Sequence, residues 1–258
     1  MLEQILEKES LTKDDLIYLM KLTKQDDLNK LYEKAYSIKE KYVGRKAYYR
    51  GLIEFSNRCV KNCYYCGIRS GNKNVERFDM SGDEIIKMAK WAYENNYGSV
   101  TLQSGERQDK NFEKFVKDMI LDIKEVSDGK LGLTLCLGEQ TEDIYREWFE
   151  AGGHRYLLRI ETTNEELYKV IHPDNNIHSF QKRVDCLKTL KKIGYQVGTG
   201  VMIGLPGQTE EDLVNDILFF EKMDIDMIGM GPYVVHKDTP LGKDVINIIK
   251  FEPEKLSC

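Results

Sequence analysis

The chain has 258 residues, of which 41% are hydrophobic and 31% charged, and its net charge is −5. That length suits one large α/β barrel or two modest domains, and the composition is that of a globular protein. Lys and Arg are spread along the chain, and no apolar stretch approaches the roughly 20 residues of a membrane span, so nothing supports a nucleic-acid or membrane partner. The N-terminus has no apolar run of signal-peptide length, and a cytoplasmic location is expected.

Residues 1–45 are expected to form a helical cap, because LTKDDLIYLMKL and LNKLYEKAYSIKEKYV carry apolar residues at helical spacing. From residue 46 to residue 258, strands and helices alternate. The predicted strands are Tyr48–Phe55, Ser99–Gln103, Leu131–Leu137, Arg155–Ile160, Gln196–Ile203 and Asp226–Met230. The predicted helices are Gly82–Asn95 with Ser81 as its N-cap, Phe112–Val126, Glu142–Ala151, Ser179–Ile193 and Thr209–Met223, which Thr209 can cap.

Six βα-type units with apolar strands are typical of a parallel sheet covered by helices, so the fold class is α/β. A complete eight-stranded barrel needs two more strands, whereas the sequence stops at FEPEKLSC, which reads as the start of another helix. Either the protein is an open barrel of six units, or the sequence is a fragment truncated before the last two strands. The fragment is favoured, because the open form would leave apolar sheet surface uncovered.

Three cysteines, Cys59, Cys63 and Cys66, follow the first predicted strand as C-x3-C-x2-C. So dense a group in a large, lysine-rich chain is more typical of metal binding than of disulfides. Three thiolates at this spacing can each hold one iron of a 4Fe–4S cluster and leave the fourth iron open to a small molecule. Structural zinc is the alternative, but it usually uses two such knuckles, and no second one is present. Cys136 and Cys186 are isolated and are expected to be buried core thiols.

Polar residues also follow the other predicted strands. Function in a parallel barrel sits at the carboxyl ends of its strands, so these residues are expected to share one rim with the cysteines. They are Gln103, Ser104, Gly105 and Glu106 after the second strand, Thr134, Gly138 and Glu139 on and after the third, Arg159, Glu161 and Thr162 at the end of the fourth, residues 204–210 (GLPGQTE) after the fifth, and Gly231 and Pro232 after the sixth.

With Tyr65 as its aromatic residue, the pattern C-x3-C-x-aromatic-C resembles the signature of the radical S-adenosylmethionine (SAM) superfamily. The resemblance implies that the three cysteines hold a 4Fe–4S cluster whose open iron chelates the amino and carboxylate groups of SAM. One electron from the cluster then cleaves SAM to methionine and a 5′-deoxyadenosyl radical. Tyr65 is implied to lie near the adenine.

Other segments resemble further parts of this family. QSGE, Gln103–Glu106, is similar to its Gly-Gly-Glu segment, with Ser104 in place of the first glycine, and implies a contact to the methionine amino group; an ordinary turn is the alternative. Glu161 is implied near the SAM ribose or amino group. Arg183 is implied near the carboxylate, with a solvated surface arginine as the alternative. VMIGLPGQTEED, from Val201, resembles the segment whose backbone binds adenine. Cofactor contacts are thus expected from Tyr65, Gln103, Ser104, Gly105, Glu106, Glu161, Arg183, Met202, Gly204 and Met230.

Longer strings, including RYLLRIET and MIGMGPYVVHKDTPL, resemble the radical SAM maturases of FeFe-hydrogenase within the biotin synthase-like group, from about residue 45 to residue 241. This implies action on an organometallic iron–cysteine complex bearing CO and cyanide, with partner maturases and an electron donor. The implied substrate-pocket residues are Arg50, Thr134, Arg155 and Arg159.

Arginines inside a barrel are costly unless they face an anion, which fits such a substrate. The alternative is that Arg155 and Arg159 pair with Glu161 or Glu139. The alternative functions are another biotin synthase-like enzyme acting on a small organic substrate, and a zinc-stabilised binding module without catalysis.

Overall fold

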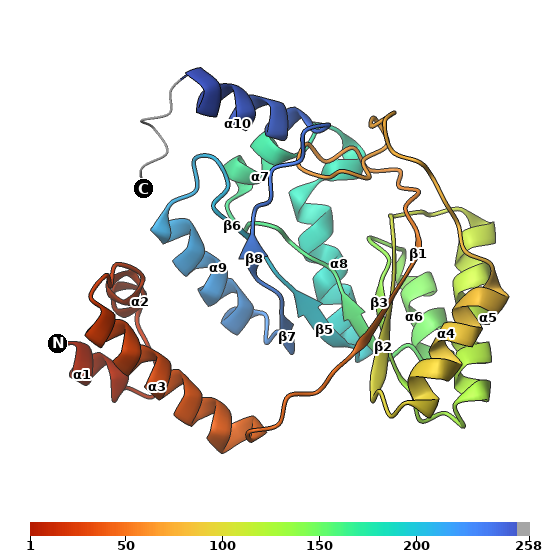
Figure 1. The fold of residues 1–258 in the computed structure, drawn as a ribbon, viewed down its shortest axis with the longest axis horizontal. Coiled ribbons are helices and arrows are strands. Elements are labelled where there is room, and N and C mark those ends of the chain that lie inside the picture. The colour runs from red at the N-terminus through yellow and green to blue at the C-terminus, as the bar shows by residue number, and fades with distance from the viewer. Residues whose placement is uncertain (252–258) are drawn as a thin grey trace.

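The computed structural model describes the backbone of residues 1–251 and the side chains of residues 1–245. Three helices come first, as predicted: α1 (Leu2–Leu6), α2 (Lys13–Met20) and α3 (Gln25–Val43). Helix α2 packs against α9 (Glu210–Lys222), whereas α3 buries none of its residues. Figure 1 shows the three helices beside the open side of the sheet. A domain boundary near residue 45 stays a prediction.

Six parallel strands form the main sheet in chain order, β1-β2-β3-β4-β5-β7. Their bounds are β1 (Gly51–Ser56), β2 (Ser99–Ser104), β3 (Gly132–Cys136), β4 (Arg155–Leu157), β5 (Gln196–Thr199) and β7 (Met227–Ile228). Within residues 1–251, β1 and β7 each have a single neighbour in this sheet, so the barrel is open between them. The predicted α/β fold with six βα units is therefore confirmed.

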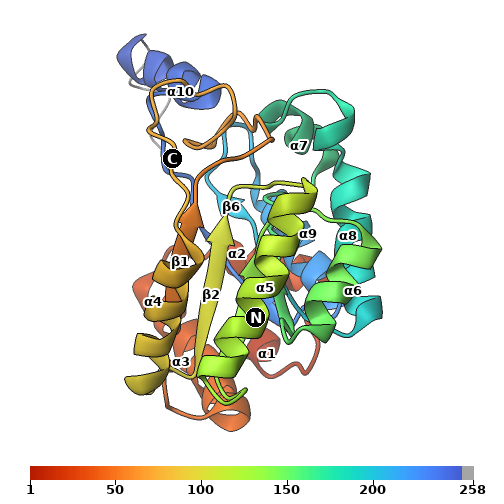
Figure 2. The ribbon, with the colours of Figure 1, turned by 90° about the vertical axis from the view of Figure 1, so that its right-hand side faces the viewer.

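Helices cover the outer face of the sheet, with α4 (Gly82–Glu94) and α5 (Lys110–Val126) lying against β1 and β2 in Figure 2. Helices α6 (Glu142–Glu150) and α8 (Phe180–Ile193) continue this layer. Side chains alternate along each strand, so one set faces the helices and the other faces the barrel interior. The set that faces the helices forms the buried core, for example Ile53, Leu102, Leu135 and Tyr156. The polar residues of the strands are thereby left on the inner face.

Every predicted strand except the second is shorter than expected, and two of them end at identifiable contacts. The fourth ends at Leu157, because the Thr199 hydroxyl takes the place of a ladder partner: it accepts from the Ile160 N–H at 3.1 Å and donates to the Leu158 carbonyl at 2.8 Å. The fifth breaks after Thr199, where the chain turns toward Glu161. Its remainder becomes β6 (Met202–Ile203), which pairs with β8 (Gly231–Pro232).

The sequence prediction missed α7 (Glu165–Ile171), the 3-10 helix η1 (Asn176–His178), β8 and most of α10 (Pro240–Phe251). Most of FEPEKLSC, predicted as a helix start, lies outside the described residues. Among the helices described, none is both long enough and apolar enough to cross a membrane.

Candidate active site

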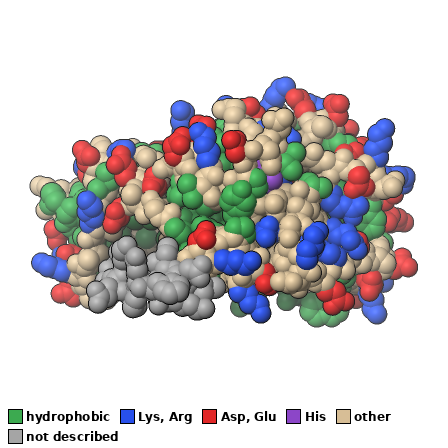
Figure 3. Space-filling view, turned by 90° about the horizontal axis from the view of Figure 1, so that it is seen from above, with side chains coloured by type: hydrophobic (Ala, Val, Ile, Leu, Met, Phe, Trp, Pro, Cys, Tyr) green, Lys and Arg blue, Asp and Glu red, His purple; other side chains and the backbone are tan. Residues whose placement is uncertain are grey.

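The three cysteines lie in the loop that leaves the carboxyl end of β1. Backbone hydrogen bonds hold this loop on two sides: the Val60 N–H donates to the Glu106 carbonyl at 2.9 Å, and the Tyr64 N–H donates to the Ile171 carbonyl at 3.0 Å. The Glu106 N–H in turn donates to the Cys59 Sγ at 3.3 Å. The loop is thus fixed between the turn after β2 and the end of α7. Figure 3 looks onto this rim, where Lys and Arg alternate with Asp and Glu around much of the edge and hydrophobic side chains gather near the middle.

Gly105 makes the close approach between the QSGE turn and the cysteine loop possible. A Cβ at Gly105 would lie 2.7 Å from the Arg58 carbonyl carbon and 2.8 Å from the Cys59 Cβ. Gly138 likewise allows the backbone after β3 to approach Glu106 closely. Its φ is +77°, and a Cβ there would lie 2.6 Å from the Glu106 Cβ. The QSGE turn is therefore packed directly against the cysteine loop, and Gly138 is packed against Glu106 of that turn.

Burial raises the pKa of all three thiols, and that of Cys63 reaches about 12. A buried thiol with so high a pKa ionises to the thiolate when it binds a metal ion, because ligation removes its proton. Within the described residues, no three His, Cys, Asp or Glu side chains converge on one ion-sized point. A 4Fe–4S cluster takes each of three thiolates on a different iron, so the three free cysteines of this loop fit it as a donor set.

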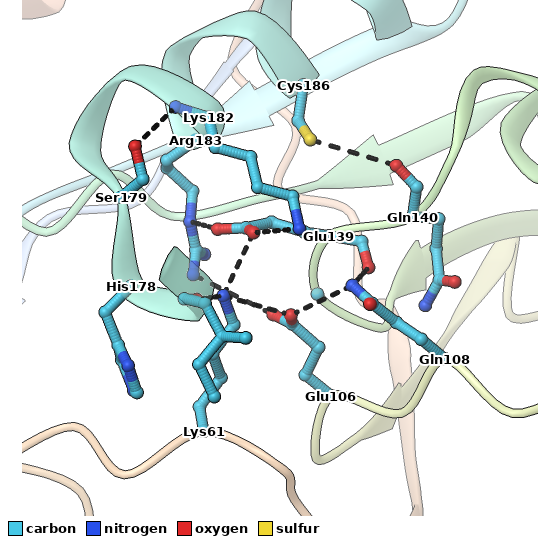
Figure 4. A network of polar contacts seen from close by, with 12 residues as sticks. Lys61, Glu106, Gln108, Glu139, Gln140, His178, Ser179, Lys182, Arg183 and Cys186 are labelled. Atoms are coloured by element: carbon cyan, nitrogen blue, oxygen red, sulfur yellow. Dashed lines mark hydrogen bonds and ion pairs between the residues drawn. The ribbon is translucent and has the colours of Figure 1, made fainter. Parts of the chain in front are cut away.

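Four charged side chains form a buried network beside the cysteines (Figure 4). The Lys61 ammonium donates to Glu139 Oε2 at 2.9 Å and lies 3.2 Å from Glu106 Oε1. On the other side, Arg183 Nε lies 2.7 Å from Glu139 Oε1, although its N–H does not point at that oxygen, so the contact is ionic rather than a hydrogen bond. Arg183 Nη2 is 3.8 Å from Glu106 Oε2. Arg183 is thus buried in the network, not a solvated surface arginine.

The network drives the pKa values of its two carboxyl groups in opposite directions. Burial raises the pKa of Glu106, and the cations offset this only in part. Burial would also raise the pKa of Glu139, but Arg183 and Lys61 outweigh it, and the pKa falls below its usual value. Glu139 is therefore the carboxylate that holds its charge most firmly.

Tyr65 is held by His172, the residue that follows α7. Its hydroxyl lies 3.4 Å from the His172 Nε2, and the two rings meet edge to face at 5.4 Å. The His172 Nδ1 lies 3.0 Å from the Tyr168 carbonyl, which can only accept, so Nδ1 carries the proton and Nε2 accepts from Tyr65. Burial lowers the pKa of His172 to about 3, so the ring is neutral at neutral pH.

Glu161 lies beyond the end of β4 in a strained backbone conformation, with a φ of +67°. Its backbone bridges to β6, since the Met202 N–H donates to the Glu161 carbonyl at 3.0 Å. Arg159 pairs with its carboxylate through two nitrogens, at 2.9 Å and 3.0 Å. The pairing of Arg159 with Glu161, given above as the alternative to a substrate contact, is thus present in this structure.

The GLPGQT loop connects β6 to α9. The Gln208 side chain organises it by accepting from the Gly204 N–H at 2.7 Å and donating to the Met202 carbonyl at 2.9 Å. Thr209 then caps α9 in a reciprocal capping box with Asp212, as predicted. Met202 is buried, whereas Gly204 is exposed and leaves its backbone accessible. Met230, after β7, is 39% exposed.

The four predicted pocket residues divide between the two ends of the barrel. Arg50 and Arg155 lie at the amino ends of β1 and β4, away from the cysteine rim, and Arg155 pairs with Gln196 at 2.7 Å rather than with a glutamate. Arg159 lies near the rim, while Thr134 is buried with no hydrogen-bond partner for its hydroxyl in the described part of the chain. Their role in a pocket stays a prediction.

One expectation about the isolated cysteines is wrong. Cys186 is a buried core residue, but Cys136 lies on the inner face of β3 and is only half-buried. Its neighbours Leu135 and Leu137 take the core positions instead. Residues of one apolar run lie on both faces of a strand, so the apolar surroundings of Cys136 in the sequence did not reveal which face it occupies.

The sequence reasoning also missed several residues that contact the cysteine loop. Lys61 lies within the motif itself, and a lysine between metal-ligating cysteines is a signal that could have been read. His178 accepts from the Asn62 N–H at 2.8 Å through its Nε2. His178 and His172 had no signal in the sequence, because only the fold brings η1 and α7 against the loop.

Comparison with known proteins agrees with this geometry. The model of the Radical SAM superfamily matches residues 53–220. The chain is 42% identical over 240 residues to the FeFe hydrogenase maturase subunit HydE of Thermotoga maritima, covering 93% of this chain and 67% of that protein. It is 25% identical over 241 residues to 3-methylornithine synthase of Methanosarcina acetivorans, again covering 93% of this chain and 67% of the relative.

Among solved structures, that of methylornithine synthase matches with a TM-score of 0.83 at 25% identity, covering 93% of this chain and 70% of that one. The maturase HydG shares the fold with a TM-score of 0.79 at 21% identity, covering 94% of this chain and 55% of that one. A family match over most of the chain, together with a relative at 42% identity, shows that the chain belongs to the radical SAM superfamily.

Proposed function

We propose that the protein is a radical SAM maturase that takes part in assembling the di-iron active site of FeFe-hydrogenase. The observation that carries the proposal is the 42% identity to HydE over 93% of the chain. The chain spans about two thirds of that relative, so the activity, substrate and partners of the whole enzyme belong to the proposal. The rim geometry supports it, since it gathers three buried or half-buried thiols, two carboxylates and an arginine at one end of the sheet.

The residues fit the two cofactors of the family. Cys59, Cys63 and Cys66 would hold the 4Fe–4S cluster. When bound, the cluster supplies the electron that cleaves SAM reductively to methionine and a 5′-deoxyadenosyl radical. Around that site, Glu106 would accept from the SAM ammonium and Arg183 would donate to its carboxylate, since Glu106 is a buried carboxylate and Arg183 is a cation whose side chain is only 12% exposed.

The remaining SAM contacts are proposed from the positions of the residues near the carboxyl ends of the strands. Glu161 would bind the ribose or the amino group, while Tyr65, the exposed Gly204 backbone, Met202 and Met230 would surround the adenine. Gln103, Ser104 and Gly105 complete the turn that carries Glu106.

A substrate would lie against the polar inner face of the sheet. Arg159 and Thr134 lie there, and Arg50 and Arg155 extend it toward the amino ends of the strands. Arginines suit an anionic ligand such as an organometallic iron complex bearing cyanide. A partner maturase that makes this complex, an electron donor and a cytoplasmic location belong to the same proposal.

Anaerobic reconstitution tests the cofactor part. The wild type should bind about four irons per chain, as one cubane cluster requires, and should cleave SAM when reduced. Cys63→Ala should lose both properties. Retention of the cluster and of SAM cleavage in Cys63→Ala would refute the assignment of the cysteines.

Genetic complementation tests the maturase part. Expression in a strain that makes FeFe-hydrogenase but lacks this maturase should restore hydrogenase activity. The likeness to methylornithine synthase favours a second candidate, a biotin synthase-like enzyme acting on a small organic substrate. SAM cleavage without complementation by the full-length protein would favour that candidate.

A further inference from the structure

Lys61 is a buried cation placed inside the cysteine motif, between Cys59 and Cys63. Lysines are almost never buried unless they are paired, and this one has three partners. Its ammonium donates to Glu139 Oε2 at 2.9 Å and to the Ile177 carbonyl, and it lies 3.2 Å from Glu106 Oε1. Lys61 therefore ties the cysteine loop to the end of β3 and to η1.

The two carboxylates of the network are not held equally. Glu139 is fully buried and has its closest contacts with Lys61 at 2.9 Å and with Arg183 at 2.7 Å. Glu106 has only longer contacts: 3.2 Å to Lys61, 3.8 Å to Arg183 and 3.5 Å to the Gln108 amide. Glu139 is thus occupied by the protein, and Glu106 keeps most of its capacity to accept hydrogen bonds.

We propose that Lys61 and Glu139 are a positioning pair for the methionine end of SAM. The positive charge of Lys61 and the negative charge of Glu139 compensate each other. Glu106 then stays available to the ammonium group of SAM, and Arg183 to its carboxylate group. This inference rests on the proposed function, because it assumes that SAM binds at this rim. Neither residue touches SAM in the proposal; both act through Glu106 and Arg183.

The electrostatics of the network explain why the pair is needed. Without the charge of Glu139, the Lys61 ammonium would have Glu106 as its only carboxylate and would compete with the SAM ammonium for it. Without Lys61, Arg183 would be the nearest cation for both carboxylates, because Lys182 is 42% exposed and lies 3.7 Å from Glu139. The two carboxylates would then compete with the SAM carboxylate for Arg183. A buried charge that loses its partner takes the nearest alternative, because low-dielectric surroundings penalise an unpaired ion.

The test measures SAM binding to the reconstituted cluster protein. We expect Glu139→Gln and Lys61→Met each to raise the Kd for SAM by about tenfold or more, the scale of one charge-assisted hydrogen bond. The change that SAM causes in the EPR spectrum of the reduced cluster should be diminished at a SAM concentration that saturates the wild type. Lys182→Met is the matched control, because Lys182 is 42% exposed and lies 3.7 Å from Glu139; its Kd should stay within about twofold of wild type.

The double variant Lys61→Met/Glu139→Gln gives the sharpest result. It removes both charges of the pair, so no lysine competes with the SAM ammonium for Glu106, and its Kd should lie closer to wild type than that of Glu139→Gln. A double variant that folds where one single variant does not would also support the pairing.

Three results would overturn the proposal. The first is a Kd for SAM and an EPR change in Glu139→Gln that equal those of the wild type. The second is a fold-increase in Kd for the double variant that equals the product of the two single-variant fold-increases, and the third is failure of all three variants to fold. The last would make the pair purely structural. A wild type that binds no cluster or SAM would refute the proposed function instead, so the two failures are distinguishable.

Discussion

Replacing Gly105 with alanine tests how closely the QSGE turn must approach the cysteine loop. A Cβ there would lie 2.8 Å from the Cys59 Cβ and 2.7 Å from the Arg58 carbonyl carbon. Carbon atoms pack best at about 3.5–4.0 Å, so the turn and the loop would have to separate by roughly 0.7 Å. The Arg58 contact is with backbone, which cannot rotate away. Overpacking of this kind costs about 1–3 kcal/mol, so Gly105→Ala should unfold roughly 2–12 °C below wild type.

The same shift should move Cys59 relative to the other two cysteines and lower the iron bound after reconstitution. The assay is thermal unfolding of the apo-protein together with iron and sulfide analysis. Gly98→Ala is the matched control: it lies just before the other end of β2, and a Cβ there would meet no atom within 4 Å. We expect that control to stay within about 0.5 kcal/mol of wild type. Wild-type stability and iron content in Gly105→Ala would refute the steric argument.

Three further predictions concern stability of the apo-protein. Trp148→Ala should lower the free energy of unfolding by about 3–5 kcal/mol, because the indole is fully buried; a urea titration showing less than 1 kcal/mol would contradict the packing described. Thr209→Ala should cost about 1 kcal/mol by removing the cap of α9, measured in the same way, and no loss would mean that the cap is not formed. The third concerns pH. Burial lowers the pKa of His172 to about 3, whereas the unfolded chain has its usual value of about 6.5. The unfolded state therefore binds the extra proton, and stability falls as pH drops from about 6.5 toward 3, by up to about 1.4 kcal/mol per pH unit. His172→Gln should show a shallower slope between pH 7 and pH 5, and an unchanged slope would count against a buried neutral ring.

Local signals in the sequence predicted the elements well. Ser81 and Thr209 were expected to cap their helices, and both form reciprocal capping boxes with an acid three residues later. The strands were found because their outward residues are apolar and their ends carry polar turns. Helix α7 was missed although Asn164 caps it, since seven residues are too few to show a clear helical period.

What the sequence could not provide is the choice of partners between distant residues. Lys61 and Glu139 are 78 residues apart, and their pairing depends on the register of β3 with its neighbours. Arg155 illustrates the same limit: it was expected to pair with a glutamate or a substrate, but it contacts Gln196, 41 residues away, at the opposite end of the barrel from the cysteines. Charge and spacing identify which groups can pair, whereas geometry decides which ones do.

The strand order of the main sheet gives the site an order of assembly. Each strand pairs with the one made just before it, so the sheet can grow along the chain as synthesis proceeds. The cysteine loop is closed on one side as soon as β2 pairs with β1, but Lys61 receives its last partner from η1, 116 residues later. The thiols of the cysteine loop are therefore synthesised well before the η1 carbonyl that gives Lys61 its last contact.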